Sequence, residues 1–430
     1  PPARTFRREL KRMLTAGRID GTLHDRCRRA FDEAIRTASR LTGARRLELQ
    51  GVVDNAHDIA ARGGLAPERL PAICLTLERN RQWWTSGSLL ASGQRVEFDG
   101  SQLVWEHYPG EGIELQVLGT FGKANGLWMA GDDVALRALL DEMVGLAARR
   151  GRAWAWEYYF DFGGGRPPWT SAMSQATGIQ ALARAGQRLG EPVYLEVAKR
   201  ALPLFQLPPP LGVRQATDAG ARYLIYSYAP GLHVVNAFVQ TLVGLFDYGA
   251  ITRSAAAGKL FRAGDRQARS DVAGADTGAW SLYALGGAES DLGYHVLLRD
   301  FLRNLCDRTT TPIYCDTAVR FTRDLREPPE LTLLTTRVRA RQRVLVRFEL
   351  SKISRVGMTI RREGETVLAT SATVSRGPHA YAWDVPPMRG IYDVVLSATD
   401  LAGNTKRTDG EIEVLRRKPS PAPRGGGARP

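Results

Sequence analysis

The apolar residues of this chain follow two different periods along the sequence. Up to about residue 330, most apolar positions recur at a spacing of three to four, which predicts amphipathic helices. Beyond that point the segments Val344–Leu350, Val356–Ile360 and Tyr392–Ala398 alternate with a period of two, which is typical of half-buried strands. We therefore expect a helical body followed by an antiparallel β-sandwich over residues 331–416.

The helical body divides into sections of different texture. Residues 1–92 predict an N-terminal helical region, and turn signals within Arg95–Leu118 predict a small β-hairpin section. From Trp169 to about Leu305, successive amphipathic stretches joined by glycine-containing turns predict helical hairpins, arranged as an open bundle or an α/α toroid. We expect residues 93–330 to form one body, which makes the chain a multidomain α+β protein.

The predicted β-sandwich carries a recognisable pattern of its own. It resembles the immunoglobulin-like modules appended to bacterial surface proteins in the stretches Tyr381–Asp384, Gly390–Tyr392 and Ala398–Asn404. The residues that follow, 417–430, are rich in proline, glycine and arginine, and this composition predicts a disordered tail.

Charge and composition narrow the classes of partner. The 430 residues include 59 Lys and Arg against 45 Asp and Glu, a formal net charge of +14. Such a balance favours an acidic polysaccharide or another polyanion, although scattered arginines also arise from codon bias alone. The chain has no helix-turn-helix, zinc-finger or RNA-binding signature, so we expect no nucleic-acid partner. No apolar run reaches the ~18 residues that would predict a membrane-spanning helix.

The four cysteines bear on the compartment. A bridge between Cys306 and Cys315 would suit an exported protein, whereas Cys27 and Cys74 are equally compatible with a second bridge or with buried free thiols. The chain begins at Pro1, which is compatible with the removal of a leader, and we expect a secreted or cell-surface protein. No cysteine or histidine cluster has metal-ligand spacing, so we expect no metal and no cofactor. As a separate expectation, the chain forms a homodimer.

The common catalytic motifs are missing, and tyrosine is the residue type that stands out. The sequence contains no GxSxG elbow, P-loop, HExxH or dinucleotide glycine fingerprint. Tyrosines instead lie beside proline, glycine or polar residues in three stretches: Tyr226–Pro230, Trp280–Tyr283 and Gly293–His295. Any one of them alone would be read as packing, because a buried tyrosine usually just packs and makes one hydrogen bond.

Taken in order, these stretches resemble the C-terminal helical domain of the D-glucuronyl C5-epimerase family. The resemblance covers about residues 95–305, and its most specific part is Asp276–Tyr283 followed by Tyr294 and His295. The weaker parts of the match are Tyr108–Ile113, Tyr159–Phe162, Trp169–Ala176, Tyr228–Pro230, Val235–Phe238 and Leu245–Tyr248. The family inverts C5 of glucuronic acid units within a polysaccharide, and the resemblance implies this activity for the chain. It also implies the fold, an incomplete α/α barrel.

This resemblance also implies roles for individual residues. Tyr228, Tyr283 and Tyr294 match the catalytic tyrosines, which remove a proton from one face of the sugar and return one to the other. The positions expected to bind substrate are Tyr108, Glu157, Trp169, Gln175, Asn236, Asp276, His295 and Arg299.

Two segments depart from the family pattern. Ser227 stands where the family has an acidic residue, and the family's Tyr-Asp-Leu-Arg is here Tyr283–Gly286, without the aspartate or the arginine. The missing arginine is the natural partner of the uronate carboxylate. Replacements for it, each also readable as an ordinary solvated arginine, are Arg166, Arg222 and Arg299.

Three other functions fit the same residues. A polysaccharide lyase begins with the same proton abstraction and would use His233 or His295 as its base. A glycoside hydrolase requires two carboxylates, for which the chain offers Glu106, Glu157, Asp161 and Asp276. A surface protein that binds acidic glycans without turnover is the non-catalytic reading.

Overall fold

The computed structural model describes residues 5–416, which fall into two compact units. Unit 1 runs to residue 272 and includes Arg303–Thr311, while unit 2 comprises Ala273–Leu302 and the chain from residue 312 onward. The tail predicted over 417–430 lies outside the described residues. No helix within residues 5–416 combines the length and apolar character that crossing a bilayer requires.

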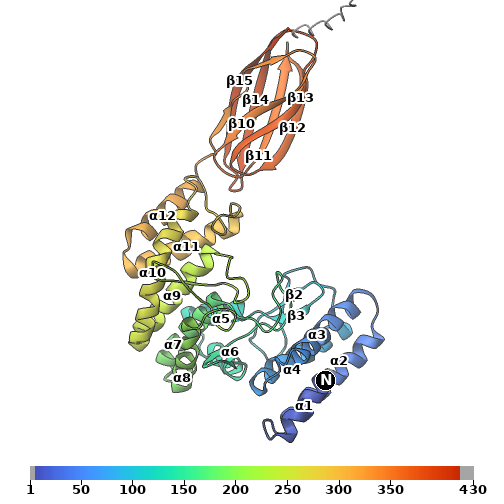
Figure 1. The fold of residues 1–430 in the computed structure, drawn as a ribbon, viewed down its shortest axis with the longest axis vertical. Coiled ribbons are helices and arrows are strands. Elements are labelled where there is room, and N and C mark those ends of the chain that lie inside the picture. Colours follow the sequence, from blue (N-terminus) through green and yellow to red (C-terminus); the bar gives the residue numbers. More distant parts are fainter. Residues whose placement is uncertain (1–4, 417–430) are drawn as a thin grey trace, which may run out of the picture. The chain divides into compact units, whose positions relative to one another are not determined.

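Unit 1 begins with the helices that the N-terminal pattern predicts, coloured blue in Figure 1. They are α1 (Phe6–Thr15), α2 (Gly21–Arg40), α3 (Gly43–Ala61) and α4 (Leu70–Ser86), with a short 3₁₀ turn (Pro67–Arg69) before α4. Asp20 caps α2 by accepting from the Leu23 amide at 2.7 Å. A disulfide between Cys27 and Cys74 joins α2 to α4, which resolves the choice between a bridge and free thiols.

A three-stranded sheet and two further helices follow. The sheet has the order β1-β2-β3, with Tyr108 opposite Gly112 in the register of β2 and β3. The elements of this section are β1 (Arg95–Val96), β2 (Trp105–Tyr108), β3 (Gly112–Leu115), α5 (Val117–Ala130), α6 (Asp133–Gly145), β4 (Ala148–Arg150) and β5 (Ala153–Ala155). The predicted hairpin section is confirmed.

Helix α7 (Ala172–Leu189) is the centre of the rest of unit 1. Nearly every residue of its first three turns is buried, and it packs against α5, α8 and α9. A Cβ on Gly244 of α9 would meet the Ala176 carbonyl of α7, so glycine permits this close approach. The remaining elements are α8 (Pro192–Ala201), a 3₁₀ turn (Leu202–Gln206), β6 (Arg214–Ala216), β7 (Ala221–Tyr223) and α9 (Val235–Thr252).

The boundary between the units falls within two helices, α10 (Ala255–Ala275) and α11 (Leu292–Thr309). Unit 2 adds α12 (Pro312–Asp324), which the sequence pattern did not single out. Cys306 and Cys315 are both disulfide-bonded, and none of the four cysteines is free.

The C-terminal part of unit 2 is β-rich, as the period-two pattern predicts (Figure 1). One sheet has the order β13-β10-β8 and the other β12-β11-β14-β15-β9, and apolar residues from both form one core around Phe348, Trp383 and Tyr392. The strands are β8 (Leu331–Leu333), β9 (Arg337–Arg339), β10 (Arg343–Leu350), β11 (Ser354–Arg362), β12 (Glu365–Val374), β13 (Gly377–Asp384), β14 (Gly390–Asp400) and β15 (Thr405–Leu415). Its immunoglobulin-like character stays a prediction.

A buried lysine fastens this β-rich part to α12. The Lys352 ammonium pairs with Asp400 at 2.7 Å and donates to the carbonyls of Asp324 at 2.7 Å and Glu327 at 2.5 Å. Asn404 adds a bond to the Leu325 carbonyl at 3.0 Å. Because the ammonium is enclosed and all of its donors are used, the end of α12 and the strand turns are held as one body.

Candidate functional site

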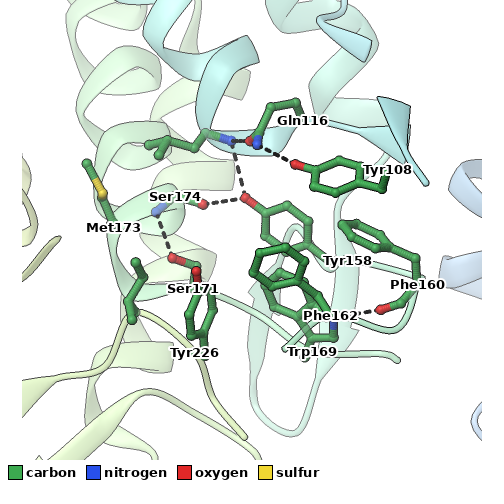
Figure 2. Close-up of a pocket in the computed structure, with 12 residues that line it drawn as sticks. Tyr108, Gln116, Tyr158, Phe160, Phe162, Trp169, Ser171, Met173, Ser174 and Tyr226 are labelled. Atoms are coloured by element: carbon green, nitrogen blue, oxygen red, sulfur yellow. Dashed lines mark hydrogen bonds between the residues drawn. The ribbon is translucent and has the colours of Figure 1, made fainter. Parts of the chain in front are cut away.

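Unit 1 contains a cavity of about 100 Å³ with a largely aromatic lining (Figure 2). Its walls come from the end of β2, the start of α5, the segment between β5 and α7, the start of α7, and residues 225–226. The lining residues are Tyr108, Gln116, Leu118, Tyr158, Phe160, Phe162, Trp169, Ser171, Met173, Ser174, Ile225 and Tyr226. A concave apolar site with a few polar groups is the usual form of a small-ligand pocket.

The aromatic rings of this pocket hold one another in place. Trp169 is central, because Tyr158 stacks on it at 4.1 Å between centroids and Phe162 at 5.9 Å. Tyr108 packs against Phe160 at 4.5 Å. Flat apolar faces with polar tips are suited to a ligand that has both an apolar face and hydroxyl groups, such as a sugar ring.

The phenols in the wall are hydrogen-bonded, and burial is the first cause of their raised pKa values. The Tyr108 hydroxyl accepts from Gln116 Nε2 at 2.9 Å, and burial and then the nearby Glu106 raise the pKa of Tyr108. The Tyr158 hydroxyl lies 2.6 Å from Ser174 Oγ, and burial raises its pKa to about 12. These two phenols therefore stay protonated at neutral pH.

Tyr228 differs from these neighbours, because its hydroxyl is buried and has no hydrogen-bond partner among residues 5–416. Its ring stacks on Tyr226 at 5.3 Å and meets Trp169 edge-on at 5.5 Å, so it joins the aromatic cluster of the pocket. Burial raises its pKa to about 12. A buried hydroxyl without a protein partner lowers the stability of the fold, and it is available to a ligand or to a water molecule.

Ser227, at the position where the family has an acidic residue, has a structural role. Its amide donates to the Thr170 carbonyl at 2.9 Å, and its Oγ accepts from the Thr170 amide at 3.1 Å. These reciprocal bonds fix the backbone between Tyr226 and Tyr228, and so orient both rings.

Glu157, which the resemblance suggested as a substrate contact, is enclosed and fully paired. Its carboxylate accepts from Arg69 at 2.6 and 2.9 Å, from Arg150 at 2.6 Å and from the Tyr159 hydroxyl at 3.2 Å. The side chain has no exposed surface. In this structure Glu157 therefore holds the segment after β5 to the N-terminal helices.

Two other expected substrate contacts also lie in the interior of unit 1. Gln175 is fully buried on α7, where its amide bonds the backbone of Trp156 at 2.7 and 3.1 Å. Asn236 is buried in the first turn of α9. Of the substrate-binding residues expected in unit 1, Tyr108 and Trp169 are the ones that line the cavity.

Unit 2 holds the other two candidate tyrosines as a pair. The rings of Tyr283 and Tyr294 are 4.8 Å apart, and Tyr294 is 42% exposed. Burial, and then the charge of Tyr294 and a hydrogen bond to it, raise the pKa of Tyr283 to about 12. The pair therefore presents one exposed phenol backed by a protonated one.

His295, next to this pair, is buried among partners that use both ring nitrogens. Nε2 lies 3.1 Å from the Phe321 carbonyl and must donate to it, which leaves Nδ1 to accept from the Ser281 hydroxyl at 2.9 Å. The ring stacks on Trp280 at 3.8 Å, and burial lowers the pKa of His295 to about 4. A neutral imidazole with both nitrogens engaged is not available as the base of a lyase.

The charged residues expected near the substrate in unit 2 are paired locally. Asp276 accepts from Arg320 at 2.8 Å and from the Gly278 amide at 2.8 Å, while Arg299 donates to Asp300 at 2.9 Å. No group of three or more His, Cys, Asp or Glu side chains within residues 5–416 is arranged to hold a metal ion.

The structure thus brings Tyr108, Trp169 and Tyr228 together in unit 1, and Tyr283, Tyr294 and His295 together in unit 2. Sequence reasoning did not assign Tyr158 or Tyr226 to the site. The available signal was the dense aromatic run over 154–162, because so many rings in so short a segment need a common cluster to pack against.

A cavity walled by stacked aromatic rings, with an unsatisfied phenol in the same cluster, makes unit 1 a helical domain with a candidate ligand site. Residues 150–323 match the family model described as the D-glucuronyl C5-epimerase C-terminus. The resemblance predicted from the sequence is confirmed over this segment.

Individual relatives agree with the family match over part of the chain. The D-glucuronyl C5-epimerase of Caenorhabditis elegans is 32% identical over 139 residues, which is 28% of this chain and 21% of the worm protein. The chain therefore matches about a fifth of the length of that curated relative.

Solved structures give weaker similarities. A sugar epimerase from a ruminal bacterium is 12% identical with a TM-score of 0.37, covering 49% of this chain and 59% of that one. The unsaturated glucuronyl hydrolase of Bacillus sp. GL1 is 15% identical with a TM-score of 0.34, covering 48% and 60%. Scores below 0.5 do not establish a common architecture.

Proposed function

We propose that this chain is a D-glucuronyl C5-epimerase-like enzyme that inverts C5 of uronic acid units in an acidic polysaccharide. Support comes from the family match over 150–323 and from the net charge of +14, which favours a polyanionic substrate. The incomplete α/α toroid, the secreted or cell-surface location and the homodimer belong to the same proposal as predictions.

The observation that carries the proposal is the Tyr228 hydroxyl, buried in the aromatic cluster of the pocket without a partner. Tyr228 is not itself a lining residue, but its ring contacts two that are, Trp169 and Tyr226. A sugar that extends from the pocket to the Tyr228 hydroxyl would supply the missing hydrogen bond. Satisfying a buried hydroxyl only in the complex favours the bound state, since the free protein carries the penalty of the unpaired group.

The reaction removes the weakly acidic C5 proton from one face of the sugar and returns a proton to the other. A phenol with a pKa near 12 holds its proton at neutral pH, so Tyr228 is suited to protonate the carbanion that forms beside the carboxylate. Tyr283 and Tyr294 are the remaining phenols of the proposal. Tyr283 is hydrogen-bonded to Tyr294. A hydrogen bond of this kind stabilises a phenolate, which is the base that the reaction requires.

The test is hydrogen exchange at C5 of glucuronic-acid polymers in deuterated water. We expect deuterium at C5 with the wild type, and a loss of roughly 10²–10⁴-fold in Tyr228→Phe. The matched control is Tyr223→Phe, a buried tyrosine whose hydroxyl donates to the Leu260 carbonyl at 2.7 Å away from the pocket lining. It should retain exchange.

The same incubations separate the alternatives. An unsaturated product that absorbs in the ultraviolet would identify a lyase, and binding of acidic polymers without C5 exchange would identify a non-catalytic glycan-binding protein. Absence of C5 deuterium from the wild type across heparosan-like and other glucuronic-acid polymers overturns the epimerase proposal.

A further inference from the structure

The turn Gly163–Arg166 lies directly against Tyr228 and has features of a cover. A Cβ on Gly165 would overlap the Tyr228 ring, and one on Gly163 would lie 3.4 Å from the Tyr228 hydroxyl. Gly165 does not have a left-handed φ, so the close approach to the ring is what requires glycine there. The backbone of this turn therefore lies over the unpartnered phenol.

The two ends of the turn are anchored by side chains, whereas its tip is held by backbone bonds within the turn. Phe162 belongs to the aromatic cluster, and the carbonyls of Pro167 and Pro168 accept from Arg62 and Arg150, both at 3.1 Å. Between these anchors the turn is closed by two backbone bonds joining Phe162 and Gly165, of 2.8 and 3.0 Å. Gly163 and Gly164 have φ values of +54° and +83°, so the tip consists of conformationally permissive residues.

Arg166 is exposed on this turn and has no ion-pair or hydrogen-bond partner among residues 5–416. The other two arginines that the sequence offered as carboxylate partners are occupied. Arg222 donates two hydrogen bonds to the Asp271 carboxylate, at 2.6 and 2.7 Å, and Arg299 donates to Asp300. Arg166 is thus the candidate whose guanidinium remains available, and it lies one residue from the backbone that contacts Tyr228.

We propose that the turn Gly163–Arg166 is a lid that lifts from Tyr228 when substrate enters, and that Arg166 on it binds the uronate carboxylate. This inference rests on the proposed function. A guanidinium binds a carboxylate through two parallel hydrogen bonds. The carboxylate carbon of a uronate is attached to C5, so this contact holds the reacting carbon near Tyr228 and offsets the negative charge that develops during proton removal. Arg166 would thereby supply a carboxylate partner in a chain that has glycine at position 286.

The first experiment measures binding, because affinity reports the contribution of Arg166 independently of turnover. The probes are a glucuronic-acid polymer and the same polymer with its carboxyl groups reduced to alcohols. We expect the wild type to bind the acidic polymer at least tenfold more tightly, Arg166→Ala to lose that preference, and Arg166→Lys to keep part of it. The matched control is Arg29→Ala. Arg29 is exposed on α2 and has no partner within the part of the chain that the structure describes, so this variant should keep a preference near that of the wild type.

Exchange kinetics distinguish failure of this inference from failure of the proposed function. In Arg166→Ala we expect KM for the acidic polymer to rise at least tenfold. If wild-type and Arg166→Ala proteins exchange C5 hydrogen equally well and Arg166→Ala keeps its preference for the acidic polymer, the Arg166 assignment is overturned while the epimerase proposal stands. If the wild type shows no exchange, the epimerase proposal is overturned, and the binding preference still reports on Arg166.

The lid is tested by chemical access to Tyr228. In Gly165→Ala the new methyl group forces the turn away from the ring, so we expect faster nitration of Tyr228 by tetranitromethane, located by peptide mass. The control is Gly122→Ala on α5, where a Cβ meets no atom within 4 Å and the backbone does not have a left-handed φ. It should leave the nitration of Tyr228 unchanged. Equal nitration of Tyr228 in the wild type and in a folded Gly165→Ala protein overturns the lid.

Discussion

The aromatic cluster that contains Tyr228 and the cluster around His295 both contain buried polar groups that the sequence predicted to be functional, and the two groups differ in hydrogen bonding. His295 uses both ring nitrogens, donating to the Phe321 carbonyl and accepting from Ser281. The Tyr228 hydroxyl has no partner within the described residues. Burial lowers the pKa of His295 and raises the pKa of Tyr228, so it favours the neutral form of each group.

This difference separates groups that stabilise the fold from a group that is available to a ligand. A buried group whose hydrogen bonds are satisfied stabilises the fold, so removing it lowers the free energy of unfolding. An unsatisfied buried group lowers that free energy until a ligand bonds to it. Motif position predicted Tyr228 as a catalytic residue and His295 as a substrate contact, and it gave no information on the hydrogen bonding of either. The distinction between them lies in neighbours that are distant in sequence, 26 residues away in the case of Phe321.

The largest expected effect comes from the most heavily paired group of unit 1. Replacing Glu157 by Gln leaves Arg69 and Arg150 facing a neutral amide in an enclosed site. Removing one partner of a buried ion pair costs about 3–5 kcal/mol, and we expect that loss in the free energy of unfolding measured by urea denaturation. A loss below 1 kcal/mol in the free energy of unfolding would mean that full hydrogen-bond pairing does not identify the groups that stabilise this fold.

The next effect is the pH dependence that His295 gives to stability. Its folded pKa of about 4 lies below the ordinary 6.5, so the unfolded chain binds more protons between these values. The free energy of unfolding should therefore fall as pH drops through this window, by about 3 kcal/mol from this group. Denaturation at pH 4.5 and 7 should show this drop, and His295→Phe should reduce it.

Asp324 works against His295 in the same pH range and needs its own control. Burial raises its pKa to about 6, so its contribution to stability is present at low pH and is lost as pH rises through 6. In Asp324→Asn the acid-induced drop should become steeper. A His295→Phe protein that keeps the full wild-type drop would contradict the role given to His295.

A smaller effect is expected for a satisfied tyrosine. Tyr223→Phe removes one hydrogen bond to the Leu260 carbonyl, a bond of 2.7 Å in the interior of unit 1. We expect a loss of about 1–2 kcal/mol in the free energy of unfolding, since the carbonyl is left without its donor. Urea denaturation beside the wild type measures this.

The smallest effect on stability is expected at Tyr228, and it sharpens the comparison most. Tyr228→Phe removes a hydroxyl that has no partner among residues 5–416, so the free energy of unfolding should stay the same or rise by up to about 1 kcal/mol. A destabilisation as large as that of Tyr223→Phe would show that the hydroxyl is satisfied in solution. The Tyr228 hydroxyl would then no longer be set apart from the satisfied groups.

The sequence predicted the parts of the molecule that depend on local periodicity. The N-terminal helices, the hairpin section and the strands beyond residue 330 all follow from spacing and turn residues, and the structure confirms them. The helix α12 was not singled out, because the expected hairpins ended near Leu305 and the residues up to 330 were left without an element.

The composition of the site was less accessible from sequence, because hydrogen-bond satisfaction depends on the tertiary structure. Glu157 and Gln175 were expected to bind substrate, and the structure instead pairs them with Arg69, Arg150 and the backbone of Trp156. These partners lie on other elements and are brought close only by folding, so matching short motifs could not identify them. The availability of Arg166 likewise emerges only once Arg222 and Arg299 are seen to be paired.

The Lys352 contact has a practical consequence for dividing the chain. A protein shortened to end before Leu331 would lose the ammonium that now binds the carbonyls of Asp324 and Glu327. It would also lose the Asn404 amide that bonds the Leu325 carbonyl. The end of α12 and the residues after it would then lose three hydrogen bonds at once, so fragments meant for assay should retain the strands.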